Sequence, residues 1–496
     1  MSPDVEFNEE VILNYFFTNK DKPIFAMKNM PPSLQNYMYV GVSRFPDMRK
    51  RFLKILKDKN ILDDVAEIIK QNQPVDDVLE NVIQFAAERN KDLYFNMKHG
   101  SSAEGASVFV VSEKNPIYAT EIQQDFYFPK TTMEFSTRYA KRFDIDHVYW
   151  DPVLMNSEFA DEIKSSFRRN FEIYKKGFDI IQQLIIERKE QGDLTTKVST
   201  LDTIRFIIPT AAYTTIILGG NSRAVIEHFT KLLGSEDNFT KDYAQKSLEE
   251  FSKVIPGFFE NLKPYQYVIE RNKRLKDYAQ SLFKGKFEPV KTDVQLFYEY
   301  PMEEVALTQI LYPFCNVPFQ EIYDTVSDFN DNERKEIFDL ANLGRENRKN
   351  PIRGFETRHL IYEIESPFGL WKDFKRNRMN LRFHQDMRGL AGFYTPPLIK
   401  ESSIAKEYEE AQKTTSDLVE RVYQKFGGLS RAVASQGSNK RYLLTMGPRQ
   451  LTVLGELRTI GEGDKGYRII ASKMISLAKE RNPRLFNHIK DNYKGE

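Results

Sequence analysis

Two kinds of segment occur twice, in the same order, along this chain of 496 residues. Each segment of the first kind reads as an apolar β-rich run, a polar residue followed by proline, and a helical pattern. The pair consists of 106–111 with Asn115-Pro116 and a helix through 128, and 359–364 with Ser366-Pro367 and a helix through 379. A polar cap followed by proline predicts a helix start, because the cap accepts an orphan amide and proline lacks one.

Each segment of the second kind reads as a strand, a tight turn and a helix. The pair consists of 214–218, Gly219-Gly220-Asn221-Ser222-Arg223 and 224–233, and of 442–445, Met446-Gly447-Pro448-Arg449 and 450–458. Glycine with a capping residue or proline is typical of such a turn. The shared order of the segments favours a duplication, so the sequence predicts two copies of one fold.

The length of the chain also favours more than one domain, because 496 residues exceed what a single core usually serves. The most linker-like segment is 284–292, where Gly285, Pro289 and several charges separate two helical patterns. We therefore expect domains at 1–288, with a helical N-terminal extension, and at 289–496. Apolar spacing in 49–62 and 74–88 predicts packing helices in that extension.

Charge and cysteine content narrow the classes of function. Lysine plus arginine (72) nearly balances aspartate plus glutamate (71), so no overall field favours nucleic acid or an anionic membrane as partner. The single cysteine, Cys315, excludes an internal disulfide and a cysteine-rich metal site, and suits the cytoplasm. No metal site is expected, because no two histidines have metal-ligand spacing. The start of the chain lacks a signal-peptide pattern, and 204–220 is too short and polar to span a membrane.

A polar loop follows the first capped helix. If this loop is extended, alternation places Glu134, Ser136 and Arg138 on one side. A carboxylate, a hydroxyl and a guanidinium together can bind a phosphate and a pyrimidine edge. The alternative is an ordinary charged surface loop.

The corresponding place in the second copy is cationic. Arg376 and Arg378 lie where the first copy has the aromatic residues 126–128, and Lys372 lies just before them. Cations at a helix C-terminus also complement the helix dipole, so a charge cap is the alternative to a binding site. The contrast between cationic and aromatic residues predicts that the two copies have different functions.

These residues resemble the flavin-dependent thymidylate synthases, most closely the long members with two fused copies. The family signature is Arg-His-Arg, a seven-residue spacer and Ser-x-Arg-Tyr. The matching segments, in family order, are 99–104, 136–139, 209–233, 354–357, 376–379 and 456–459. The resemblance covers nearly all of the chain. It implies an α+β class with two tandem synthase-like domains, each a small antiparallel sheet packed with helices, in a chain that is helix-rich overall.

The resemblance also implies roles for individual residues. The flavin-contacting triplet survives as Arg376-Asn377-Arg378, with asparagine in place of histidine, and the nucleotide-binding motif survives in the loop at Glu134. The implied catalytic and substrate-binding residues are Gln123, Glu134, Ser136, Arg138, Tyr139 and Arg458. The implied cofactor contacts are Arg376, Asn377, Arg378, Asn221, Arg223 and Arg449.

The two copies keep different parts of the family's site. The phosphate-binding arginine is Arg458 in the second copy but Leu232 in the first. The second copy's counterparts of Glu134, Ser136, Arg138 and Tyr139 are His384, Asp386, Arg388 and Gly389. Because family sites form between subunits, we expect one composite site built from both halves. The opposite site is expected to be dead, since leucine cannot replace a guanidinium and aspartate repels phosphate.

The implied activity is the reductive methylation of dUMP to dTMP. Methylenetetrahydrofolate would donate the carbon, NADPH would be the reductant and FAD the hydride carrier, in a homodimer of fused pairs. Asn377 and Thr357 both stand where the family has histidine. Two alternatives therefore stay open: a non-catalytic fused paralogue that binds nucleotide or flavin, and a flavoenzyme acting on another uracil-containing substrate.

Overall fold

The chain forms two compact units. The computed structural model describes residues 3–495 except 43–44, 46, 98–99, 126–129, 137–142, 189–192, 284–285, 289–292, 298–300, 345–351, 356–359, 376, 378–379, 462–463 and 488. Unit 1 comprises 1–112, 128–133 and 217–265, and unit 2 comprises 113–127, 134–216 and 266–496. The boundary at 288/289 stays a prediction from the sequence.

Unit 1 is mainly helical. Its helices are α1 (Pro3–Phe16), α2 (Pro32–Gly41), α3 (Met48–Asp58), α4 (Leu62–Lys70), α5 (Asp76–Lys91), α10 (Ser222–Leu233) and α11 (Asn238–Val254). Helices α1–α5 share an apolar core that includes Phe16, Phe52 and Leu79, all fully buried. Helices α3 and α5 confirm the packing helices predicted at 49–62 and 74–88. Asp47 caps α3 by accepting a hydrogen bond from the backbone N–H of Lys50.

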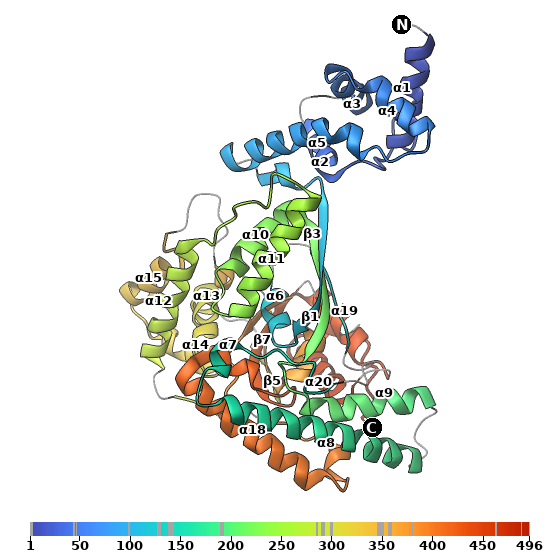
Figure 1. Ribbon diagram of the computed structural model, residues 1–496. Helices are drawn as coiled ribbons and strands as arrows, with labels where there is room; N and C mark the ends of the chain where they lie inside the picture. The colour runs from blue at the N-terminus through green and yellow to red at the C-terminus, as the bar shows by residue number, and fades with distance from the viewer. Residues whose placement is uncertain are drawn as a thin grey trace. The chain divides into compact units, whose positions relative to one another are not determined.

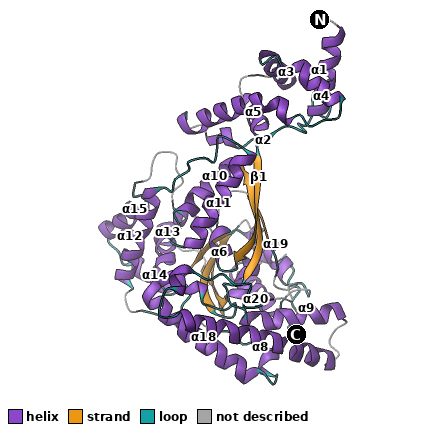
Figure 2. Cartoon of the chain, viewed as in Figure 1, coloured by secondary structure: helices purple, strands orange, loops and turns teal. Residues whose placement is uncertain are grey.

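Unit 2 holds the second sheet and most of the remaining helices, and helices outnumber strands throughout (Figure 2). Its helices are α6 (Ala119–Gln123), α7 (Pro152–Met155), α8 (Ala160–Glu187), α9 (Asp193–Ile204), α12 (Gln266–Leu282), α13 (Met302–Leu311), α14 (Phe319–Ser327), α15 (Asp331–Ala341), α16 (Phe368–Phe374), α17 (Pro397–Lys400), α18 (Ala405–Phe426), α19 (Pro448–Arg458), α20 (Lys465–Arg481) and α21 (Pro483–Phe486). Its strands are β4 (Asp293–Phe297), β5 (Leu360–Pro367), β6 (Leu381–His384) and β7 (Asn439–Met446). Strands β1 (Ser107–Pro116), β2 (Lys130–Glu134) and β3 (Tyr213–Asn221) have residues in both units.

The order of elements repeats. The first repeat runs β1, α6, β2, α7, α8, α9, β3, α10 and α11, and the second runs β5, α16, β6, α17, α18, β7, α19 and α20, so the two orders differ by α9. One sheet has the strand order β1-β3-β2 and the other β4-β5-β7-β6, so in each repeat the last strand lies between the first two. The structure thus confirms an α+β class with two small antiparallel sheets and supports the duplication.

The long helices of the two repeats pack against each other. Helices α8 and α18 lie side by side in unit 2 (Figure 1), and Ser166 Oγ lies 3.3 Å from Thr415 Oγ1 across their contact. Asn170 donates to the same Thr415 oxygen at 3.3 Å. Polar side chains buried between two helices need such partners, because an unpaired polar group costs its full desolvation.

The predicted helix starts were wrong in register. Asn115 and Pro116 end strand β1, and α6 begins only at Ala119. In the second repeat Pro367 is the N-cap of α16, and no side-chain hydrogen bond caps that helix. Pairing with a neighbouring strand kept these residues extended: Pro367 faces Asn439 of β7 in the ladder. A proline at the end of a strand costs little, since its missing N–H lies where pairing stops.

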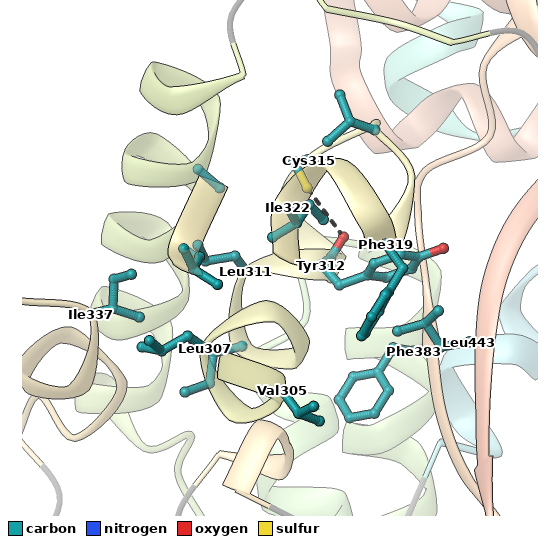
Figure 3. Packing of buried hydrophobic residues seen from close by; sticks show 14 of the residues in the cluster. Val305, Leu307, Leu311, Tyr312, Cys315, Phe319, Ile322, Ile337, Phe383 and Leu443 are labelled. Atoms are coloured by element: carbon teal, nitrogen blue, oxygen red, sulfur yellow. Dashed lines mark hydrogen bonds between the residues drawn. The ribbon is translucent and has the colours of Figure 1, made fainter. Parts of the chain in front are cut away.

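One face of the second sheet carries an apolar core. Ile361, Leu381, Phe383 and Leu443 pack against α13 and α14 (Figure 3). Cross-strand register explains the grouping, because Leu381 and Ile361 both lie opposite Thr445. Cys315 is buried in this core, where burial raises the pKa of its thiol to about 12. The predicted core segment at 204–220 is likewise largely buried, and no described helix is long and apolar enough to cross a membrane.

Glu363 is a buried carboxyl group in this apolar face. Its Oε1 accepts hydrogen bonds from the Tyr312 hydroxyl and the Phe319 backbone N–H, both at 2.8 Å. Burial raises the pKa of Glu363 to about 7 from the ordinary 4.5, although Arg441 opposes the rise. The folded protein therefore binds this proton more tightly than the unfolded chain does. The resulting stabilisation is complete below pH 4.5 and is lost as the pH rises through 7.

We expect Glu363→Gln to remove this pH dependence while keeping the Oε1 acceptor. At pH 5 the variant and the natural protein should have similar free energies of unfolding, and at pH 8 the variant should be more stable by roughly 1–3 kcal/mol. Both tryptophans, Trp150 and Trp371, lie in unit 2, so urea denaturation followed by tryptophan fluorescence reports this unit. A stability difference that does not change with pH would contradict the prediction.

Candidate functional site

A buried charged cluster lies where Glu134 of the first repeat meets α16 of the second. Glu134 Oε1 lies 2.9 Å from Lys372 Nζ, and Glu134 Oε2 lies 3.1 Å from Lys375 Nζ. The three side chains are at most 2% exposed. Gln124 also donates to Glu134 Oε2 at 3.2 Å. The loop carboxylate and the cationic helix end, which the sequence singled out separately, are therefore in direct contact.

Local structure explains how these side chains reach one another. Glu134 ends strand β2, and the next residue stays paired, because the Phe135 N–H donates to Thr215 O at 2.8 Å. Glu134 is buried while Phe135 is 49% exposed, as expected for alternate residues of an extended chain. Lys372 and Lys375 are three residues apart at the C-terminal end of α16, so they share one side of the helix.

Arg382 joins the equivalent helices of the two repeats. This β6 side chain donates to the backbone carbonyl of Lys375 at the end of α16 and to that of Gln124 at the end of α6, the latter at 2.7 Å. Lys375 also hydrogen-bonds to Thr120 Oγ1 of α6. A guanidinium that binds the last carbonyls of two helices satisfies orphan acceptors and opposes both negative helix ends.

Burial dominates the electrostatics of these cations. It lowers the pKa of Lys375 to about 8, with Glu134 opposing the shift and Lys372 adding to it. It lowers the pKa of Arg382 to about 10, with Asp125 opposing and Arg353 adding to the shift. Both groups are therefore charged at neutral pH, but their charged forms are less stable than they would be in water.

The region around His384, which is the counterpart of Glu134 in the second repeat, contains internal ion pairs. Lys440 of β7 pairs with Glu121 of α6, and the His384 ring lies 3.7 Å from the same carboxylate. Burial lowers the pKa of His384 to about 4, so its ring is neutral at pH 7. Asp386 lies 3.6 Å from Arg431. Internal ion pairs therefore occupy this side of the duplication, and the loss of a site there stays a prediction.

Arg458 lies against the same helix as the lysines. Its Nη2 donates to the Asp373 carbonyl of α16 at 2.8 Å, and its guanidinium lies 5.3 Å from the ring centre of Tyr467. The Asp373 carboxylate is 3.5 Å from the buried Arg205, which also lies 3.0 Å from Asp464. Burial lowers the pKa of Arg205, but its three aspartate neighbours outweigh burial and raise it.

The other residues predicted for the site fall into two groups. Gln123 is buried and donates to Asn115 Oδ1 at 2.9 Å, Ser136 is half-buried just beyond Glu134, and the Asn377 N–H donates to Phe374 O at 3.1 Å. Arg138, Tyr139, Arg376 and Arg378 lie outside the described residues, as does the side chain of Arg449.

Asn221 and Arg223 belong to unit 1. Asn221 is the N-cap of α10 and accepts from the Ala224 N–H at 2.8 Å, and Arg223 pairs with Glu104 at 2.6 Å. The asparagine of the predicted turn thus has a structural role, because asparagine is a common N-cap residue of helices. Leu232 is 2% exposed, so it is a core residue of α10.

Sequence reasoning missed Glu121, Arg382 and Lys440. A usable signal existed for Arg382: Asn380, Arg382 and His384 recur at every second position between apolar residues, which is typical of one polar side of a strand. Glu121 and Lys440 gave no such signal, because their pairing joins positions 319 apart in the chain. Among the described residues, no group of three or more histidine, cysteine, aspartate or glutamate side chains is placed to hold a metal ion.

The structure defines a duplicated α+β protein in which equivalent helices of the two repeats meet at a buried charged cluster. Residues 63–257 match the model of a family described as thymidylate synthase complementing protein.

Long relatives share nearly the whole chain. The UPF0159 protein of Chlamydia muridarum is 24% identical over 97% of this chain and 94% of its own length. The UPF0159 protein of Chlamydia pneumoniae is 25% identical over 95% of this chain and 92% of its own length. A UPF0159 protein of Thermoplasma acidophilum is 24% identical over 58% of this chain and 59% of its own length.

Proposed function

We propose that this protein is a flavin-dependent thymidylate synthase with one composite active site per chain. The reaction would convert dUMP to dTMP, with methylenetetrahydrofolate and NADPH as co-substrates and FAD as cofactor. The family match of residues 63–257 supports the class of activity. The contact of Glu134 with Lys372 and Lys375 supports a site made from both repeats.

The residues near this cluster suit an anionic nucleotide and a flavin. Buried lysines and Arg382 at the ends of α6 and α16 provide positive charge for phosphate groups, and Arg458 of α19 contacts α16. In the proposal Arg138 and Arg458 neutralise the phosphate of dUMP and Ser136 orients it. Arg376, Asn377 and Arg378 hold FAD, which would supply hydride transfer when bound. Asn221, Arg223 and Arg449 remain further predicted flavin contacts.

The closure of the opposite site supports a single active site. Glu121, Lys440, Asp386 and Arg431 already pair with one another there, so a phosphate would have to displace internal ion pairs. We further propose a division at 288/289 and a homodimer of fused pairs in the cytoplasm. The stoichiometry of FAD bound to purified protein tests the single site, with one flavin per chain expected.

Flavin content and tritium release test the activity itself. We expect purified protein to be yellow and to release tritium from C5-labelled dUMP when methylenetetrahydrofolate and NADPH are present. A colourless protein that takes up no added FAD would support a non-catalytic paralogue, which Asn377 in place of histidine favours. A flavoprotein that leaves the C5 label in place would act on another uracil-containing substrate.

A further inference from the structure

Asn380 is a buried amide without a hydrogen-bond partner. It immediately precedes β6 and is 3% exposed, and neither its Oδ1 nor its Nδ2 is hydrogen-bonded in the part of the chain that the structure describes. Folded proteins pair nearly all buried side-chain amides, because an unpaired one has lost water without compensation. An amide left open at such a place can bind a partner from outside the chain.

Strand alternation places Asn380, the residue before β6, on the side that carries Arg382 and His384. Side chains alternate along a strand, and the intervening Leu381 and Phe383 enter the apolar core on the other side. The His384 ring lies 6.3 Å from that of Trp371, so this polar side faces α16. Arg382 is 8% exposed, and its Nε is likewise without a partner although its two terminal nitrogens bind helix-end carbonyls.

Buried cations gather in this region. Lys372, Lys375 and Arg382 are three buried cations, and Glu134 is the carboxylate that pairs with both lysines. The nearby Asp125 is paired with Arg353. The carbonyl ends of α6 and α16 add only partial negative charge. Burial lowers the pKa of Lys375 and of Arg382, so an anion beside them would stabilise their charged forms.

We propose that Asn380, Lys375 and Arg382 form a phosphate subsite, with the amide and the two cations donating to phosphate oxygens. The inference rests on the proposed function only for the molecule that carries the phosphate. The monophosphate of dUMP and the diphosphate of FAD present the same chemistry to these donors. Inorganic pyrophosphate presents it without either base.

Asn380→Leu separates a ligand-binding amide from a structural one. The substitution removes an unpaired polar group, so the thermal transition of the free protein, followed by tryptophan fluorescence, should stay or rise. Affinity for pyrophosphate, and for whichever of dUMP and FAD uses the subsite, should fall by about 10- to 100-fold in calorimetric titrations. Loss for dUMP alone assigns the nucleotide phosphate, and loss for FAD alone assigns the flavin diphosphate.

Gln309→Leu is the matched control. Gln309 lies on α13, is fully buried, and also has neither amide atom hydrogen-bonded within the described structure. We expect this change to leave all three affinities as they are. Asn380→Asp is a second variant of unchanged size, and its carboxylate should repel phosphate even if the leucine variant does not fold. Lys375→Met should weaken the same ligands.

The outcomes distinguish the subsite from the proposed function. If Asn380→Leu lowers the thermal transition temperature and leaves all three affinities unchanged, the subsite is overturned. The amide would then be a structural group that binds internal water. Natural protein that binds none of the three ligands would overturn it as well. Protein that binds pyrophosphate through Asn380 but neither dUMP nor FAD would keep the subsite and end the proposed function.

Discussion

Glu134→Ala is expected to destabilise unit 2 by about 3–5 kcal/mol, because it leaves Lys372 and Lys375 buried without their common carboxylate. The attraction between the charges is the smaller part of the effect. The larger part is the cost of keeping two ammonium groups out of water beside each other. Urea denaturation followed by the fluorescence of Trp150 and Trp371 measures the loss where it occurs.

Two further variants test whether the loss of stability comes from the buried charges. Glu407→Ala removes the exposed pair with Lys176 and should change stability by less than about 1 kcal/mol. The triple variant Glu134→Leu, Lys372→Met, Lys375→Met replaces the buried charges with apolar groups and should recover most of the lost stability. A single variant as stable as the natural protein would show that water reaches the lysines.

Arg458→Ala is expected to weaken dUMP binding by about 10- to 100-fold while FAD stays bound. A guanidinium held at the end of α19 would contribute a charge-assisted contact to the nucleotide phosphate. Loss of its hydrogen bond to the carbonyl of the buried Asp373 should cost about 1–3 kcal/mol of stability. Calorimetric titration of dUMP and of FAD into the same preparation measures both affinities.

Arg481→Ala is the control for this change. Arg481 is the last residue of α20, as Arg458 is of α19, so both substitutions remove a cation from a helix C-terminus. Arg481 is exposed and should not affect either ligand. Equal dUMP affinity in natural protein and Arg458→Ala would refute the assignment of Arg458 to the phosphate. Loss of both ligands would mean that Arg458 acts through the position of α16.

Local patterns in the sequence revealed the repeats but not the contacts between them. The strand, turn and helix around Asn221 and around Gly447 were predictable, because glycine, capping and apolar spacing are local signals. The loop at Glu134 and the cationic end of α16 were each visible as unusual. Their direct contact was not, since it joins positions more than two hundred residues apart.

The misplaced helix starts show why local signals failed elsewhere. A polar residue before proline predicts a cap equally well at Asn115 and Ser366, yet both residues complete strands. Ser366 lies opposite Lys440 in the β5–β7 ladder, and that long-range pairing overrides the local preference. Arg382 was missed for a related reason. Its side chain donates to two carbonyls that belong to helices of different repeats, and no local pattern shows that contact.

The two repeats carry different charges at equivalent positions, and this difference determines which repeats can pair. Glu134 and His384 are 250 positions apart (384 − 134), and the same spacing relates Lys372 and Lys375 to Ile122 and Asp125. Two first repeats facing each other would bring Glu134 to an aspartate, and two second repeats would bring His384 to two lysines. Only the mixed pair joins opposite charges, so the ancestral interchangeability of the copies has been lost and separately made halves should associate as unlike partners.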